Sequence, residues 1–301
     1  MKKLFLTLYT AFIICSASAQ NRAVSAKDYT FKVLVNKGQN QLKVGNDWLP
    51  LKVGASLKVS DELKVSQNAY LGLVHAEGKP LEVKEAGLHK VSDLAGKITG
   101  GSSVLNKYTD FILSVKEQKS GNLTATGAVN RGEDYVKVYL PASQSAVVYN
   151  DMISFAWSKS PKTREWVVKF NSMFGDELDR MEVQDTTISI NLSGPKFLNE
   201  DNIIVTVSSK SDPKKTSEAW MIKKLSTADK TRIKNALTEI ATQTSEQTAL
   251  NKLLLAAFYE QNFLLIDAST TIQQAIKLAP SVPQFQQGYN EFLVRHSFGK
   301  K

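Results

Sequence analysis

The spacing of apolar residues changes along the chain, and this change limits the fold more than any other feature of the sequence. From Tyr29 to Ile98, apolar and polar residues alternate in the stretches FKVLV, LKVSDELKV, YLGLV and LEV. Alternation with a period of two is typical of β-strands that bury one face. From Ser226 onward, apolar residues recur three or four positions apart, which is typical of helices. The 301 residues therefore predict a multidomain α+β protein.

Glycines punctuate the first β stretch at turn-like intervals. They free the backbone at turns between short strands, which predicts an all-β module over residues 20–98. The stretch GKITGGSS that follows has the composition of a flexible linker. Residues 99–132 are expected to form a linker with one helix, because four apolar residues have helical spacing: Leu105, Tyr108, Ile112 and Val115.

A tryptophan, a G-x-x-L, a D-x-L, an apolar strand and a G-x-x-L-x-V hairpin follow one another in the first module. These positions are Trp48, Leu51, Gly54, Leu57, Asp61, Leu63, Val65, Tyr70–Val74, Gly78, Leu81 and Val83. Over about 70 residues this pattern resembles the FecR-type periplasmic domain, although Glu77-Gly78 stands where that family usually has Asp-Gly. The resemblance implies an all-β binding and signal-relay module. Trp48 is expected to anchor its core, and contact with a partner is the alternative.

Residues 133–225 predict a second β domain. Turn signals separate eight short apolar stretches, which suggests a β-sandwich: YVKVYL, SAVVY, MISFAW, EWVVKF, ELDRMEV, TTISINL, NIIVTVS and EAWMIKKL. The succession ISFAW, Ser160-Pro161, WVVKF resembles a fibronectin type III-like domain, although Trp166 stands where a tyrosine is usual. The resemblance implies that Trp157 and Trp166 pack in the core, and an exposed aromatic platform for sugars is the alternative.

Residues 226–301 predict a C-terminal α-helical bundle. Ser226 and Asp229 have capping-box spacing at the start of its first helix, over 227–243. A helix pair resembles the tetratricopeptide repeat at Leu255, Ala256, Tyr259, Ala268, Ile272, Ala275 and Pro280, and a last helix is expected over 284–296. Lys252 replaces the tryptophan usual in that family, and no second copy is found. The resemblance implies a surface for a protein partner, with Asn251, Lys252 and Glu260 as candidate contacts, and packing on the sandwich is the alternative.

The first residues predict export. Lys2 and Lys3 precede an apolar run from Leu4 to Ile14 and the small triplet 17–19, which is the layout of a secretory signal peptide cleaved after Ala19. The run is too short to predict a transmembrane segment. Ile14 before Cys15 does not fit a lipoprotein signal. A periplasmic location is therefore expected, with Gln20 as the mature N-terminus and no cysteine in the mature chain.

The charge balance bears on the class of partner. Without Lys2 and Lys3 the formal net charge falls from +9 to +7. Such a protein can bind peptidoglycan or another anionic envelope polymer, although scattered lysines also serve solubility alone. Nucleic acid is not expected as a partner outside the cytoplasm.

No pattern for catalysis or cofactor binding is found. His75, His89 and His296 lack the spacing of metal ligands, and there is no G-x-S-x-G, zinc or phosphate-loop motif. We therefore expect no enzyme, no cofactor and no metal. The expected function is a periplasmic scaffold that binds an envelope protein. The alternatives are a FecR-like component of a relay between an outer-membrane receptor and a sigma factor, or binding of a cell-wall polymer.

Overall fold

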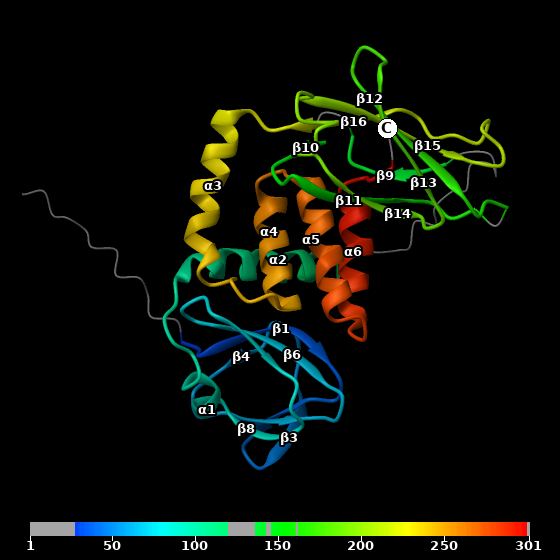
Figure 1. Ribbon diagram of the computed structural model, residues 1–301. Helices are drawn as coiled ribbons and strands as arrows, with labels where there is room; N and C mark the ends of the chain where they lie inside the picture. Colours follow the sequence, from blue (N-terminus) through cyan, green and yellow to red (C-terminus); the bar gives the residue numbers. More distant parts are fainter. Residues whose placement is uncertain (1–27, 120–135, 143–145, 161, 300–301) are drawn as a thin grey trace, which may run out of the picture.

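The structure is a computed structural model that describes residues 28–119, 136–142, 146–160 and 162–299. The expected signal peptide, with Cys15 and Ala19, lies outside these residues, as do Pro161 and positions 120–135. Several largely antiparallel sheets and six α-helices occur in the described part, which confirms the α+β class. Figure 1 shows a layer of helices with one β unit on each side of it.

The first β unit consists of two four-stranded sheets. The sheet in the order β4-β1-β6-β7 contains β1 (Phe31–Lys37), β4 (Ser56–Leu57), β6 (Tyr70–His75) and β7 (Pro80–Val83). The sheet in the order β3-β2-β5-β8 contains β2 (Gln41–Val44), β3 (Asp47–Pro50), β5 (Glu62–Val65) and β8 (Gly87–Lys90), followed by the helix α1 (Val91–Ala95). A buried core lies between the sheets and includes Phe31, Leu57, Leu63 and Leu71.

The turn between β6 and β7 requires glycine, as the hairpin pattern predicts. Gly78 has a φ of 85°, a backbone conformation that side chains with a Cβ rarely adopt. A Cβ at this position would also lie 2.0 Å from the Ser102 carbonyl oxygen. The glycine therefore serves both the turn and the close approach of the following segment.

The second β unit has every strand that the apolar pattern predicts. A five-stranded sheet, β10-β16-β15-β12-β13, faces a three-stranded sheet, β14-β11-β9. The strands are β9 (Val138–Tyr139), β10 (Val147–Val148), β11 (Met152–Trp157), β12 (Trp166–Asn171), β13 (Glu177–Val183), β14 (Thr187–Asn191), β15 (Asn202–Ser209) and β16 (Trp220–Lys224). Trp157 and Trp166 are buried and meet edge to face at 6.0 Å between the sheets. Both residues pack in the core. The alternative prediction, an exposed aromatic platform for sugars at these two residues, is therefore wrong.

The helical layer contains α2 (Asn106–Lys119), α3 (Thr227–Ala241), α4 (Ala249–Gln261), α5 (Leu265–Leu278) and α6 (Pro283–Arg295). Ser226 caps α3, since its hydroxyl accepts a hydrogen bond from the Asp229 N–H at 3.2 Å. The helices α4 and α5 form a packed pair in which Ala256, Tyr259 and Ala268 are buried. Leu255 is only partly buried, and the neighbouring Leu254 is the one that enters the core.

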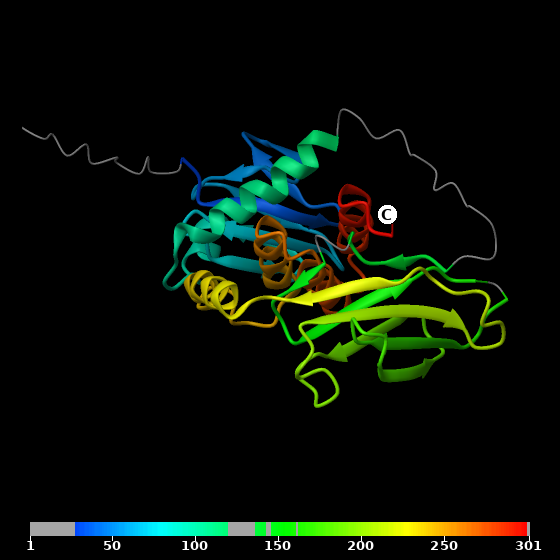
Figure 2. The same ribbon diagram turned by 90° about the horizontal axis from the view of Figure 1, so that it is seen from above.

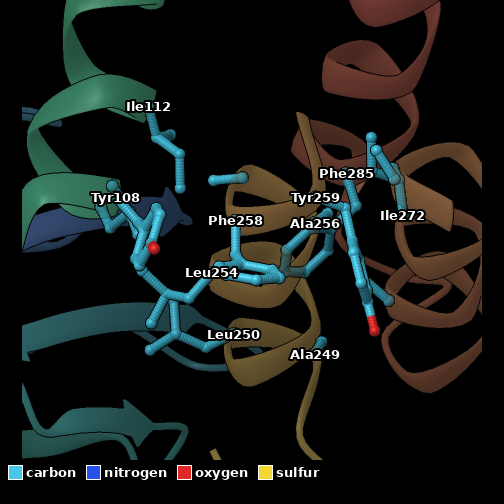
Figure 3. Packing of buried hydrophobic residues seen from close by; sticks show 14 of the residues in the cluster. Tyr108, Ile112, Ala249, Leu250, Leu254, Ala256, Phe258, Tyr259, Ile272 and Phe285 are labelled. Atoms are coloured by element: carbon cyan, nitrogen blue, oxygen red, sulfur yellow. The ribbon is translucent and has the colours of Figure 1, made fainter. Parts of the chain in front are cut away.

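The helix α2 belongs to the helical layer rather than to a linker. Tyr108 of α2 meets Phe258 of α4 edge to face, with ring centroids 5.8 Å apart. Figure 3 shows Tyr108 and Ile112 pointing from α2 toward α4 within one apolar cluster. Seen from above in Figure 2, α2 crosses the strands of the first β unit. This helix therefore packs on residues that are far away in the sequence.

The first β unit contributes to the same core through a bulge in β1. The register of β1 shifts between Val33 and Val35, and a bulge turns the following side chain to the other face of the sheet. Val33 packs inside the first β unit, whereas Leu34 and Val35 pack with the helices. Tyr70 and Val74 of β6 join them. The helices are thus seated on one sheet of this unit by apolar packing.

A glutamate fixes the position of α4 on that sheet. The Oε1 atom of Glu82, in β7, accepts hydrogen bonds from the Tyr70 hydroxyl and, at 3.0 Å, from the Leu250 N–H in the first turn of α4. Burial raises the pKa of Glu82, whereas hydrogen bonds from Lys84, Tyr70 and the Leu250 N–H lower it, so the pKa lies below its ordinary value. A negative charge at a helix N-terminus also interacts favourably with the helix dipole.

A buried aspartate fixes the sandwich on the other side of the helices. Asp267, in the first turn of α5, is fully buried and accepts hydrogen bonds from the Tyr149 and Asn150 N–H groups, each at 2.8 Å. The Asn150 amide donates a third hydrogen bond at 2.7 Å. One turn later, the Thr270 hydroxyl accepts from the Ser154 N–H at 2.9 Å. The adjacent Ile266 packs into the core of the sandwich.

Candidate functional site

The helical layer contains an apolar groove where α2, α4 and α6 meet above β1. The apolar lining comes from all four elements and includes Val35 of β1, Phe111 and Val115 of α2, Leu253 and Ala257 of α4, and Phe292 of α6. The groove has a volume of about 70 Å³, several times the roughly 10–15 Å³ that one water molecule needs by a comparable measure. Its apolar walls suit the insertion of an apolar side chain.

A glycine inside a helix keeps this groove open. Gly288 lies in the middle of α6 and lines the groove, and a Cβ built on it would meet nothing within 4 Å. Glycine in a helix interior lowers stability by about 0.5–1 kcal/mol relative to alanine. Since no neighbouring atom requires a glycine here, its effect on the structure is to leave open the part of the groove beside α6.

The charged residues that line the groove are Lys116, Glu260, Glu291 and Arg295. Arg295 donates to a single oxygen of Glu260, Oε1, from Nε at 2.9 Å and from Nη2 at 2.7 Å. The His296 ring nitrogen Nε2 lies 2.6 Å from the same oxygen. The Glu260 side chain is 9% exposed and that of Arg295 is 30% exposed. The ion pair is therefore built into the wall, and the guanidinium is its more accessible partner.

The wall of the groove also contains an unsatisfied polar atom. Gln284 donates its amide N–H to the Asn36 carbonyl oxygen at 3.0 Å, and its own Oε1 is buried with no hydrogen-bond partner among the described residues. Lys116, which also lines the groove, donates to the Leu34 carbonyl oxygen at 3.1 Å. A buried acceptor without a donor costs free energy, so this part of the wall is kept at some cost to stability.

The structure separates the three candidate contacts on α4. Glu260 lines the groove. Lys252 is partly buried outside the groove lining, and this burial lowers the pKa of its ammonium. The expectation that Asn251 is an exposed contact residue is wrong. The residue is 5% exposed, and its amide donates to the Glu246 carbonyl oxygen at 2.9 Å near the start of α4. It therefore stabilises the entry to the helix, and its side chain is buried rather than exposed on the surface.

Trp48 requires a second correction, because it lies on the outer face of its sheet and not in the core. Leu63 is fully buried and pairs with Leu42, and residues directly opposite each other in a sheet share a face. Trp48 pairs with Lys43, which is the neighbour of Leu42 and so lies on the other face. The indole is partly exposed, and the Lys43 ammonium lies 6.0 Å from the ring centroid.

Pairing registers arrange this outer face in two rows across β3, β2, β5 and β8. The first row contains Trp48, Lys43, Glu62 and Lys90, and the second contains Pro50, Gln41, Lys64 and Leu88. Lys43 and Glu62 form an ion pair at 2.8 Å. The hydrogen bond and charge of Lys43, together with the charge of Lys90, lower the pKa of Glu62. Three lysines thus share the face with one ionised glutamate.

Sequence patterns contained signals for these surfaces. The helical periodicity of QFQQGYNEFLVR is interrupted by one glycine, which marks Gly288 as a position where something other than helix stability is served. Arg295 lies two turns after Gly288, and no sequence pattern marks it as a functional residue. On the sheet, the alternation that buries Leu63 places Glu62 and Lys64 outward together.

No family model matches this chain, and no curated protein is found to be similar to it. Within the described residues, no helix is long and apolar enough to cross a bilayer. The same part of the chain contains no group of three or more His, Cys, Asp or Glu side chains that is placed to hold a metal ion.

Proposed function

We propose that this protein is a non-enzymatic scaffold of the bacterial cell envelope that binds a partner protein in the groove between α2, α4 and α6. The observation that carries the proposal is the open apolar space beside Gly288, with charged side chains in its lining. The envelope location rests on the signal-peptide pattern of the first residues.

The groove fits an anchor residue better than a reaction. Its apolar walls would enclose one large apolar side chain of the partner, which is how a few central residues supply most of the energy of a protein interface. A carboxylate beside that anchor would approach the partly exposed Arg295, since guanidinium groups bind carboxylates with directed hydrogen bonds. The recognised segment is therefore an apolar residue followed or preceded by an acid.

Filling the groove provides the test. We expect that Gly288→Leu places a side chain in the open space and reduces capture of the partner from solubilised envelope by about tenfold or more. The matched control is Gln286→Leu, which adds the same side chain to an exposed position of the same helix. Quantitative pull-down, with a melting curve for each variant, measures both effects.

The comparison of partner capture by the native protein and the two variants tests the proposal. A band that is retained by Gln286→Leu and lost with Gly288→Leu, at unchanged melting temperature, supports the groove. Equal capture by the native protein and both variants would contradict it. Substitution is preferable to deletion of residues 226–301, because that deletion would expose the apolar face of β1 and β6.

A further inference from the structure

The outer face of the sheet β3-β2-β5-β8 is a second surface, separate from the groove. Figure 1 shows this sheet on the side of the first β unit that is turned away from the helices. The groove is bounded by β1 in the opposite sheet. Binding at one surface therefore does not require the other, and the two proposals fail or succeed independently.

Positive charge dominates this face. Lys43, Lys64 and Lys90 lie on three adjacent strands, and Glu62 is the one carboxylate among them in the described rows. Neighbouring strands lie about 4.7–4.9 Å apart, so the three lysine side chains leave the sheet close to one another. Their excess over Glu62 leaves net positive charge for a negatively charged ligand.

The apolar residues of the face lie on its two edge strands, β3 and β8, and not at its centre. Trp48 and Pro50 lie on β3 at one edge, and Leu88, 70% exposed, lies on β8 at the other. Protein interfaces usually have an apolar centre and a polar rim. The opposite arrangement here does not favour a folded protein partner, and it suits a polymer that places charge on the lysines and a flat ring on the indole.

We propose that this face binds an acidic glycan, a polysaccharide that carries carboxylate groups. The carboxylates would lie over Lys43, Lys64 and Lys90, and the apolar face of one sugar ring would stack on Trp48. The cation beside the ring fixes the indole, because an ammonium at 6.0 Å from its centroid interacts with the π-face. No apolar pocket is needed for this mode of binding.

Labelled polygalacturonate is the probe, with binding to the full chain measured by fluorescence anisotropy. We expect Trp48→Ala to weaken binding about tenfold, and the double variant Lys43→Gln/Lys90→Gln to weaken it at least as much. The matched control is Lys214→Gln/Lys277→Gln, which removes two exposed lysines outside this face and should change the affinity less than about twofold. Added salt should weaken binding to the native protein more than to the Lys43/Lys90 variant.

Binding of other polymers, measured in the same way, can overturn the proposal. Binding of poly-glutamate with the same affinity and no dependence on Trp48 would mean attraction of any acidic chain. Tighter binding of single-stranded oligothymidylate would make the face a nucleic-acid surface, and equal binding of neutral dextran would remove the role of charge. A native protein that does not bind polygalacturonate also overturns it. Unchanged melting temperatures show that the substitutions leave the fold intact.

Discussion

Asp267 shows how a single residue joins two parts of the molecule at an energetic cost. Its carboxylate accepts three hydrogen bonds from Tyr149 and Asn150, yet burial raises its pKa from 3.8 to about 6. Tyr259 also faces this site, and burial keeps its pKa above the ordinary range. Near neutral pH the charged carboxylate is therefore held in place against the cost of removing it from water.

The raised pKa predicts an unusual pH dependence. Between the unfolded value of 3.8 and the folded value of about 6, the folded state binds more protons than the unfolded state, so stability falls as pH rises through this window. Lowering the pH from 7 to 5 should raise the unfolding free energy by about 1 kcal/mol through Asp267 alone. Urea unfolding at both pH values measures this change, with Asp267→Asn as the comparison. The prediction is wrong if both proteins respond equally to pH.

At single residues, the sequence predicted that buried and exposed side chains alternate, but not which residue of an adjacent pair faces the core. Trp48 and Leu49 are adjacent and both apolar, so alternation requires one of them to face outward without indicating which. The pairing with Lys43 decides it, and pairing is set by contacts that a local pattern does not contain. Asn251 was misplaced for a similar reason, since its burial depends on the Glu246 carbonyl in the preceding loop.

Among the elements, Glu82 predicts a measurable coupling between β7 and α4. Replacing it with alanine leaves the Tyr70 hydroxyl and the Leu250 N–H without their acceptor. We expect Glu82→Ala to lower the unfolding free energy by about 1–3 kcal/mol. Because the folded pKa is below the ordinary value of 4.5, this contribution is present above that value and is lost as pH falls through the folded pKa.

Denaturant unfolding of Glu82→Ala beside Glu85→Ala provides the measurement, since Glu85 is an exposed glutamate close to it in the sequence. Similar losses in the two variants would show that general charge, and not the capping contact, is responsible. A smaller effect of Glu82→Ala in a Tyr70→Phe background would confirm that the two residues act together.

Element types were predictable from periodicity, whereas their partners were not. The eight strands between residues 133 and 225 and the helices after Ser226 all lie where the apolar spacing places them. The parallel pairing of β10 with β16 has no local signal, because it joins Val147 to Lys223. The packing of α2 on α4 is equally non-local, so a helix between two glycine-rich stretches was assigned to a linker.

For the whole molecule, shared cores predict a single unfolding transition. One apolar cluster contains residues of β1, β6, α2, α4, α5 and α6, and Ile266 of α5 extends into the core of the sandwich. Separate domains would unfold independently, but here each layer covers apolar surface of the next. Calorimetry should therefore give one transition whose van't Hoff and calorimetric enthalpies agree. Two resolved transitions would show that the layers are only weakly coupled.

The position of α2 in the chain has a consequence during synthesis. In the sequence, 129 residues, including the whole sandwich, separate the last residue of α2 from the first of α4. At about 5–20 residues per second, a ribosome needs roughly 6–26 s to make them. Throughout that interval Tyr108 and Ile112 of α2 have no α4 to cover them. The nascent chain therefore exposes an apolar surface that chaperones can bind before α4 has been synthesised.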